Sequence, residues 1–169
     1  MTTESSLPAD ISGAVLTSNV EAISVARSLA DIRSRVGAIL LPQALPTGFG
    51  LVSSSLLVDR DVVLNYRKQD VDGPIAPVLT VKLIRQVNLK VKQGTAESIK
   101  VGALDGVLVT GGWSATPDGT LAWKPDGYLS IIVSRDGWNV IVSAAETKAD
   151  EPYWTRDALI KIAESMGGA

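Results

Sequence analysis

A strict alternation of apolar and polar side chains runs through the middle of the chain and limits what it can fold into. The apolar members hold odd-numbered positions: Leu79, Val81, Leu83, Val87, Leu89 and Val91, with Thr80, Lys82, Gln86, Asn88, Lys90 and Lys92 between them. Successive side chains of a strand point to opposite faces. The pattern therefore predicts one long strand, or two strands kept in phase, with an apolar face inward and a basic face in water. Only Ile84 and Arg85 break the alternation, so we expect a bend near Arg85.

Four Asp-Gly pairs divide the second half of the chain into short apolar segments. They are Asp105-Gly106, Asp118-Gly119, Asp126-Gly127 and Asp136-Gly137. Glycine adopts a positive φ at little cost and aspartate tolerates it, so each pair is typical of a tight hairpin turn. The short spacing between the pairs favours antiparallel neighbours over strand–helix–strand units.

Helices are predicted at both ends of this region. Ser18 and Glu21 have the spacing of a capping box, which predicts a helix over residues 18–36 that ends at Gly37; Ser24 is an alternative start. Thr155 caps a second helix over residues 156–166, which ends at Gly167-Gly168. Between the first helix and the strands, the prolines in residues 39–49 exclude a helix and predict extended backbone.

Together these elements predict a single α+β domain over residues 14–169, preceded by a flexible N-terminal arm over residues 1–13. The sheet is expected to be one twisted antiparallel meander, flanked by an N-terminal and a C-terminal helix. No run of eighteen apolar residues occurs, so no transmembrane segment is predicted.

The composition restricts the chemistry. The 169 residues include no histidine and no cysteine, which excludes disulfides, thiol nucleophiles, Ser-His-Asp triads and zinc sites of the Cys/His type. The net charge of −2 predicts no general attraction to nucleic acid. We expect no enzymatic activity, no cofactor and no metal.

Two acidic motifs need separate consideration. Asp70-x-Asp72-Gly73 resembles the start of a calcium loop, but its twelfth position is Val81 rather than glutamate, so we interpret the motif as a turn. Asp59 and Asp61 have the spacing of paired carboxylates on one strand face, as a glycosidase would use them. The adjacent Arg60 favours a solvated turn instead.

A possible interaction surface comes from lysines and one tryptophan: Lys82, Lys90, Lys92, Lys100 and Trp113. The lysines would form a basic stripe suited to an anionic surface or an acidic partner. The alternative is a solvated sheet face whose lysines prevent edge pairing. Trp113, beside Gly111-Gly112, is expected to be the most exposed aromatic; the alternative for the tryptophans is packing in the core.

Several motifs at the two ends of this scheme resemble one protein family. Ile39-Leu40-Leu41-Pro42 precedes Leu45-Pro46-Thr47-Gly48-Phe49, and a helix with Ala26 and Ala30 comes before both. Near the C-terminus stand Leu121-Ala122-Trp123, Asp126-Gly127-Tyr128 and the segment Leu159-Ile160-Lys161-Ile162-Ala163-Glu164-Ser165-Met166. In order and spacing these resemble a bacterial domain-of-unknown-function family found outside the membrane in anti-sigma-factor-like membrane proteins and lipoproteins. The additional strand-like stretch at 136–143 departs from that pattern.

The resemblance implies an extracytoplasmic location, as part of a longer or processed protein, and carries over no active site. The alternative is a cytoplasmic protein, because the first residues lack the pattern of a signal peptide. We expect a non-enzymatic, monomeric binding or sensing module of the bacterial envelope, whose partner is an envelope protein or an anionic surface. The alternatives are a carrier of an apolar molecule or lipid between sheet and helices, and a carboxylate-dependent hydrolase.

Overall fold

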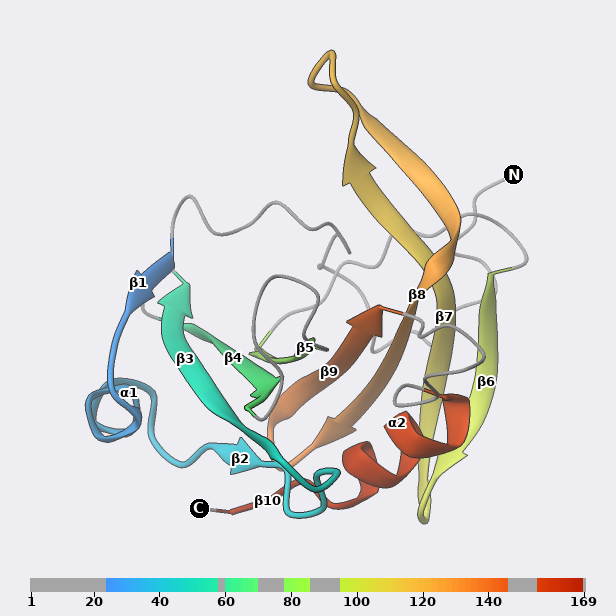
Figure 1. Ribbon diagram of the computed structural model, residues 1–169. Coiled ribbons are helices and arrows are strands. Elements are labelled where there is room, and N and C mark those ends of the chain that lie inside the picture. The colour runs from blue at the N-terminus through green and yellow to red at the C-terminus, as the bar shows by residue number, and fades with distance from the viewer. Residues whose placement is uncertain (1–23, 58–59, 70–77, 86–94, 146–154, 169) are drawn as a thin grey trace.

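The computed structural model describes residues 24–57, 60–69, 78–85, 95–145 and 155–168. Its elements, in chain order, are β1 (Ser24–Ala26), α1 (Leu29–Val36), β2 (Leu40–Leu41), β3 (Phe49–Leu57), β4 (Asp61–Lys68), β5 (Val78–Ile84), β6 (Ala96–Val101), β7 (Leu104–Ala115), β8 (Leu121–Arg135), β9 (Trp138–Ala145), α2 (Arg156–Glu164) and β10 (Gly167–Gly168). The predicted α+β class is confirmed, with one large antiparallel sheet and a helix near each end (Figure 1).

The large sheet has eight strands in the order β1-β3-β4-β5-β9-β8-β7-β6. It consists of two meanders, β3–β5 and β6–β9, which join because β5 pairs with β9, and of the short strand β1, which pairs with the outer edge of β3. The alternation that begins at Leu79 places β5 at this junction. Its odd-numbered residues lie in register with apolar residues on both sides: Leu83 is opposite Val62 and Val140, and Val81 is opposite Leu64 and Val142.

The inner face of the sheet is covered by the helices and by the small β2–β10 sheet. Ile32 of α1, Leu40 of β2, and Leu159 and Ile162 of α2 pack in the same cluster as the inward side chains of the sheet. Leu64, Leu79, Val81, Leu83, Ile131, Val140 and Val142 are fully buried there. We call this group the inner cluster. The burial of Leu79, Val81 and Leu83 confirms the predicted apolar face for the residues of β5. The rest of that predicted face, Val87, Leu89 and Val91, lies outside the described residues.

Polar residues at both ends of α2 make hydrogen bonds that position this helix. Thr155 caps α2 as predicted, because its side chain accepts a hydrogen bond from the Ala158 N–H. Glu164 Oε1 accepts a hydrogen bond from the Gly102 N–H in the β6–β7 turn. Ser165 Oγ accepts hydrogen bonds from the Gln43 and Ala44 N–H groups, each 3.1 Å away, and donates one to the Ile162 carbonyl. These contacts join the end of α2 to the β6–β7 turn and to the segment that follows β2.

The predicted start of the first helix is wrong in the described region. Residues 24–26 form β1, and α1 starts only after Ser28, whose side chain accepts a hydrogen bond from the Asp31 N–H. The cap of α1 is therefore made by Ser28 and Asp31, and Ser18 and Glu21 lie outside the described residues. Val25 instead pairs with Leu56 of β3. Pairing with a strand that is distant in sequence therefore outweighs the local preference of these residues for a helix. The predicted end at Gly37, with φ of +86°, is confirmed.

Two of the four Asp-Gly pairs are turns and two are not. Asp118-Gly119 and Asp136-Gly137 form the β7–β8 and β8–β9 turns, and Asp136 itself has a positive φ of 51°. Asp105-Gly106 and Asp126-Gly127 instead lie inside β7 and β8. The β6–β7 turn is made at Gly102, whose φ of +61° favours a residue without a side chain. Gly106 lies beyond this turn, in β7, close to Val101 of β6.

The prediction of a basic, solvated outer face is wrong for β5. A second cluster of Ile84, Val107, Val109, Ile132 and Ile141 is buried on that face. Lys82 is half-buried and lies between Val63 and Ile141 in the ladder. Next to it a row of polar side chains crosses five adjacent strands: Ser53, Asn65, Thr80, Ser143 and Ser130. Hydrogen bonds join Ser53 to Asn65, Asn65 to Thr80, and Ser143 to Ser130.

Candidate binding surface on the β7–β8 hairpin

The outer half of the β7–β8 hairpin extends beyond the rest of the sheet. Among the described residues, β6 pairs with β7 up to Val109, with one further hydrogen bond from the Thr110 N–H to the Thr95 carbonyl, and β9 pairs with β8 up to Tyr128. In the described part of the chain, residues 112–124 therefore have only each other as strand neighbours. Figure 1 shows this segment rising away from the sheet. We call residues 112–124 the distal ribbon.

The distal ribbon leaves the sheet at an irregular point in the ladder. Thr110 pairs with Leu129, but Gly112 pairs with Lys124, so one residue of β7 is opposite four of β8. The single intervening residue, Gly111, has φ of +94°, a conformation that favours glycine. An extra-residue bulge of this kind bends the strand pair and increases its twist. The bulge explains why the ribbon departs from the direction of the sheet.

The tip of the ribbon is held by a dense group of hydrogen bonds. Thr116 N–H donates to the Thr120 carbonyl at 2.7 Å, and Gly119 N–H donates to the Thr116 carbonyl at 2.9 Å. Asp118 Oδ1 accepts hydrogen bonds from the Thr120 N–H at 3.2 Å, from the Thr120 hydroxyl at 2.8 Å and from the Thr116 hydroxyl. An isolated two-stranded hairpin is only marginally stable in water. These hydrogen bonds hold the conformation of the turn, because the tip lies away from the hydrophobic core of the sheet.

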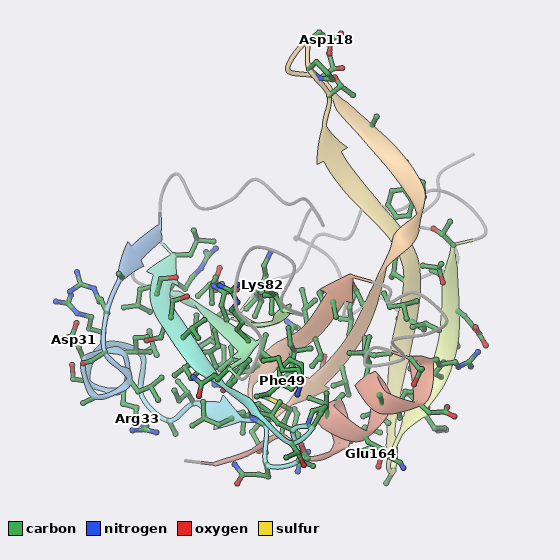
Figure 2. The ribbon with its side chains drawn as sticks, viewed as in Figure 1. Asp31, Arg33, Phe49, Lys82, Asp118 and Glu164 are labelled. Atoms are coloured by element: carbon green, nitrogen blue, oxygen red, sulfur yellow. The ribbon has the colours of Figure 1, made fainter. Side chains whose placement is uncertain are left out.

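The tip carries a fixed negative charge. Hydrogen bonds from the Thr116 side chain, then from the side chain and backbone of Thr120, lower the pKa of Asp118 to about 2. The carboxylate is therefore ionised throughout the physiological range. Figure 2 shows Asp118 at the end of the ribbon, far from the labelled Lys82 in the body of the sheet.

Both tryptophans of the ribbon lie opposite each other on its two strands. Trp113, predicted to be the most exposed aromatic, pairs in register with Trp123. The side chain of Trp123 is half-buried and packs, with Ala96, against the outer cluster of Ile84, Val107, Val109, Ile132 and Ile141. Trp123 thus anchors the base of the ribbon. The side chain of Trp113 lies outside what the structure describes, so its predicted exposure stays a prediction.

The two predicted lysines that the structure describes do not come together. Lys82 of β5 and Lys100 of β6 lie on strands separated by β9, β8 and β7, about 19 Å apart at the usual strand spacing. Lys100 forms an ion pair with its cross-strand neighbour Asp105. Lys90 and Lys92 lie outside the described residues.

Asp61 is not in a solvated turn, which corrects the sequence-based interpretation. It begins β4 and is buried, with Oδ1 accepting a hydrogen bond from the Arg85 N–H at 3.1 Å and Oδ2 lying 3.3 Å from Arg60. Its proposed partner Asp59 and the Asp70–Gly73 motif lie outside the described residues. The role of Asp61 in the described region is to tie the start of β4 to the end of β5.

Sequence reasoning missed the distal ribbon because it treated each Asp-Gly pair as a turn and divided β8 accordingly. A signal was available: Trp113 and Trp123 are equally distant from Asp118. Symmetry of this kind around a turn is expected for residues that face each other in a long hairpin.

Comparisons with known proteins give no relative. No family model matches the chain, and no curated protein or solved structure shows significant similarity to it. In the part of the chain that the structure describes, no helix has the length and apolar character needed to cross a membrane.

Proposed function

We propose that the chain is a binding module of the bacterial envelope, outside the cytoplasm, and that the distal ribbon recognises a partner protein. The observation that carries this proposal is the ribbon itself: a strand pair without further strand neighbours in the described structure, anchored at its base and fixed at its tip. A turn that is ordered before binding loses less conformational entropy when a partner binds.

A protein partner is favoured over an anionic surface by the charge of the ribbon tip. Asp118 is ionised at neutral pH and would be repelled by acidic lipid headgroups. Of the lysines expected to attract such a surface, the two that the structure describes are poorly suited to it: Lys82 is half-buried and Lys100 is paired with a carboxylate. The alternative of an apolar carrier has less support, because buried side chains of the inner cluster occupy the space between the sheet and α2 where the ligand would have to bind.

The proposal is tested by photo-crosslinking in cells that express the chain naturally. A benzophenone amino acid replaces Pro117, which is exposed at the tip, and in a matched control it replaces Asp157, which is exposed in the first turn of α2. We expect a discrete protein adduct from position 117 and none from position 157. Adducts in equal amounts from both positions, or none from position 117, would contradict recognition through the ribbon.

The anionic-surface alternative has its own assay. The wild-type protein and the triple variant Lys82→Gln, Lys90→Gln, Lys92→Gln are sedimented with phosphatidylglycerol vesicles. We expect neither protein to bind the vesicles. Binding of the wild type that is lost in the triple variant would favour the lysine surface over the ribbon.

A further inference from the structure

We infer that the β7 edge of the distal ribbon accepts an extended segment of the partner as an additional antiparallel strand. This inference rests on the proposed function and specifies how the partner is recognised. Strand addition at a free sheet edge is a common way for a protein to bind an extended peptide, because backbone hydrogen bonds supply the contact.

The hydrogen-bond pattern identifies which backbone groups of β7 face away from β8 and have no strand partner among the described residues. Thr116 N–H donates to Thr120, so residues 116 and 120 form a hydrogen-bonded pair. Hydrogen-bonded and non-hydrogen-bonded pairs alternate along an antiparallel ladder. In the register of β7 with β8, Trp113 with Trp123 and Ala115 with Leu121 are then the non-hydrogen-bonded pairs. The N–H and C=O groups of Trp113 and Ala115 therefore point away from β8, along the β7 edge.

Other strand edges of the described sheet carry features that discourage pairing. The edge strand β6 carries Glu97 and Lys100, which form ion pairs with Arg156 and Asp105. β3 has an irregularity between Leu51 and Ser53, and β1 covers its end. Charged residues, bulges and short covering strands are known ways to block an edge.

The two edges of the ribbon also differ in the features that discourage strand pairing. Its β8 side ends in Lys124, and the next residue, Pro125, has no N–H to donate. Its β7 side consists of Gly112, Trp113, Ser114 and Ala115, with no charge and no proline. On the β8 side Leu121 and Trp123 also have outward N–H groups, but a strand added there would lie beside Lys124 and could not continue past Pro125. The β7 side has neither feature, so it is the edge that we assign to the partner strand.

The edge also defines the chemistry of the partner segment. An added antiparallel strand would have its amino end near the tip, because β7 runs toward the tip. The Asp118 carboxylate lies there, so a basic residue at the amino end of the segment gives charge complementarity. The partner class is an extended, proline-free segment of uncharged residues that begins with lysine or arginine.

The probe is the blocked peptide Lys-Val-Thr-Val-Thr, added to isotope-labelled full-length protein and followed by NMR. We expect the largest amide shifts at Trp113 and Ala115, and weaker binding of the peptide that starts with glutamate. Ala115→Pro removes an outward N–H of the β7 edge. Leu121→Pro removes the corresponding N–H directly opposite, on the β8 edge, and is the matched control. Ala115→Pro should weaken binding about tenfold or more, and Leu121→Pro by less than about twofold.

The outcomes separate the two proposals. Shifts confined to the β8 side, or equal losses in the two proline variants, would overturn strand addition at β7 even if the adduct from position 117 forms. If Ala115→Pro disorders the ribbon, seen as loss of the Thr116 and Gly119 amide signals, Ala115→Lys provides the same edge test through charge. Concentration-dependent shifts at Trp113 without peptide would assign the edge to a second copy of this chain, and would overturn the inference.

Discussion

The guanidinium group of Arg85 lies over the indole ring of Trp138, 3.3 Å from the ring centroid. The same group donates hydrogen bonds to the Gly137 carbonyl in the β8–β9 turn and to the Val36 carbonyl at the end of α1, both at 3.1 Å. Trp138 in turn donates from Nε1 to the Ala38 carbonyl at 3.0 Å. The bend expected at Arg85 is thus the point where α1, β5 and β9 are joined.

Replacing Arg85 with alanine should lower the free energy of unfolding by about 2 kcal/mol, since a cation–π contact and two hydrogen bonds from a charged donor are lost. Lysine should recover only part of this loss, because it cannot stack on the ring and reach two carbonyl groups together. Urea unfolding followed by tryptophan fluorescence measures both variants. Arg156→Ala, which removes an exposed ion pair with Glu97, is the control and should cost less than about 1 kcal/mol.

Ser165 is the second position where one side chain joins distant segments. Ser165→Ala would leave the Gln43 and Ala44 N–H groups without the hydroxyl oxygen that they share. We expect a loss of about 1–2 kcal/mol in unfolding free energy, measured by thermal or urea unfolding. Ser98→Ala, at an exposed serine of β6, should change the stability by less than about 0.5 kcal/mol. Equal effects of the two substitutions would mean that the bridge adds nothing.

Gly106 allows β6 and β7 to pack closely. A Cβ atom at this position would lie 3.0 Å from Val101 Cγ2 and 3.0 Å from the Ile132 carbonyl oxygen, and both neighbouring residues are buried. Gly106→Ala should therefore destabilise the fold by about 1–3 kcal/mol, as overpacking of a core typically does. The measurement is the midpoint of urea unfolding. An unchanged midpoint would mean that the sheet adjusts freely around this position.

The sequence predicted those parts of the fold in which local pattern and burial agree. The alternation at Leu79, Val81 and Leu83 correctly identified an inward face, and Thr155 correctly marked the start of α2. The β5–β9 pairing could not be predicted, because the two strands are far apart in sequence and no local signal specifies which antiparallel neighbours meet. The prediction for the outer face was wrong because the polar residues of β5 indicate solvent, whereas Val63 and Ile141, the neighbours of Lys82 in the ladder, are buried.

The candidate site was only partly predictable for a related reason. Trp113 was selected from its glycine-rich surroundings, and the structure places it on the projecting ribbon. The Asp105-Gly106 and Asp126-Gly127 pairs have the same local turn preference as Asp118-Gly119. Pairing with β6 and β8 keeps Asp105-Gly106 inside β7, and Asp126-Gly127 lies in β8 at the irregular point of the ladder between Lys124 and Leu129. Among the described residues no further strand flanks Asp118-Gly119.

The pH response of the ribbon tip follows from the lowered pKa of Asp118. The folded-state pKa of about 2 is below the ordinary aspartate value of 3.8, so the stabilisation of the tip is complete above pH 4 and is lost as the pH falls from 4 toward 2. The carboxyl carbon of Asp118 should titrate in NMR with a midpoint near 2, and the amide signals of Thr120 should shift with it. In Asp118→Asn the Thr120 amide should lose this transition and show a shift typical of a looser turn already at neutral pH. A midpoint near 3.8 would mean that the threonine hydrogen bonds do not hold the carboxylate, and that the tip is not ordered before a partner binds.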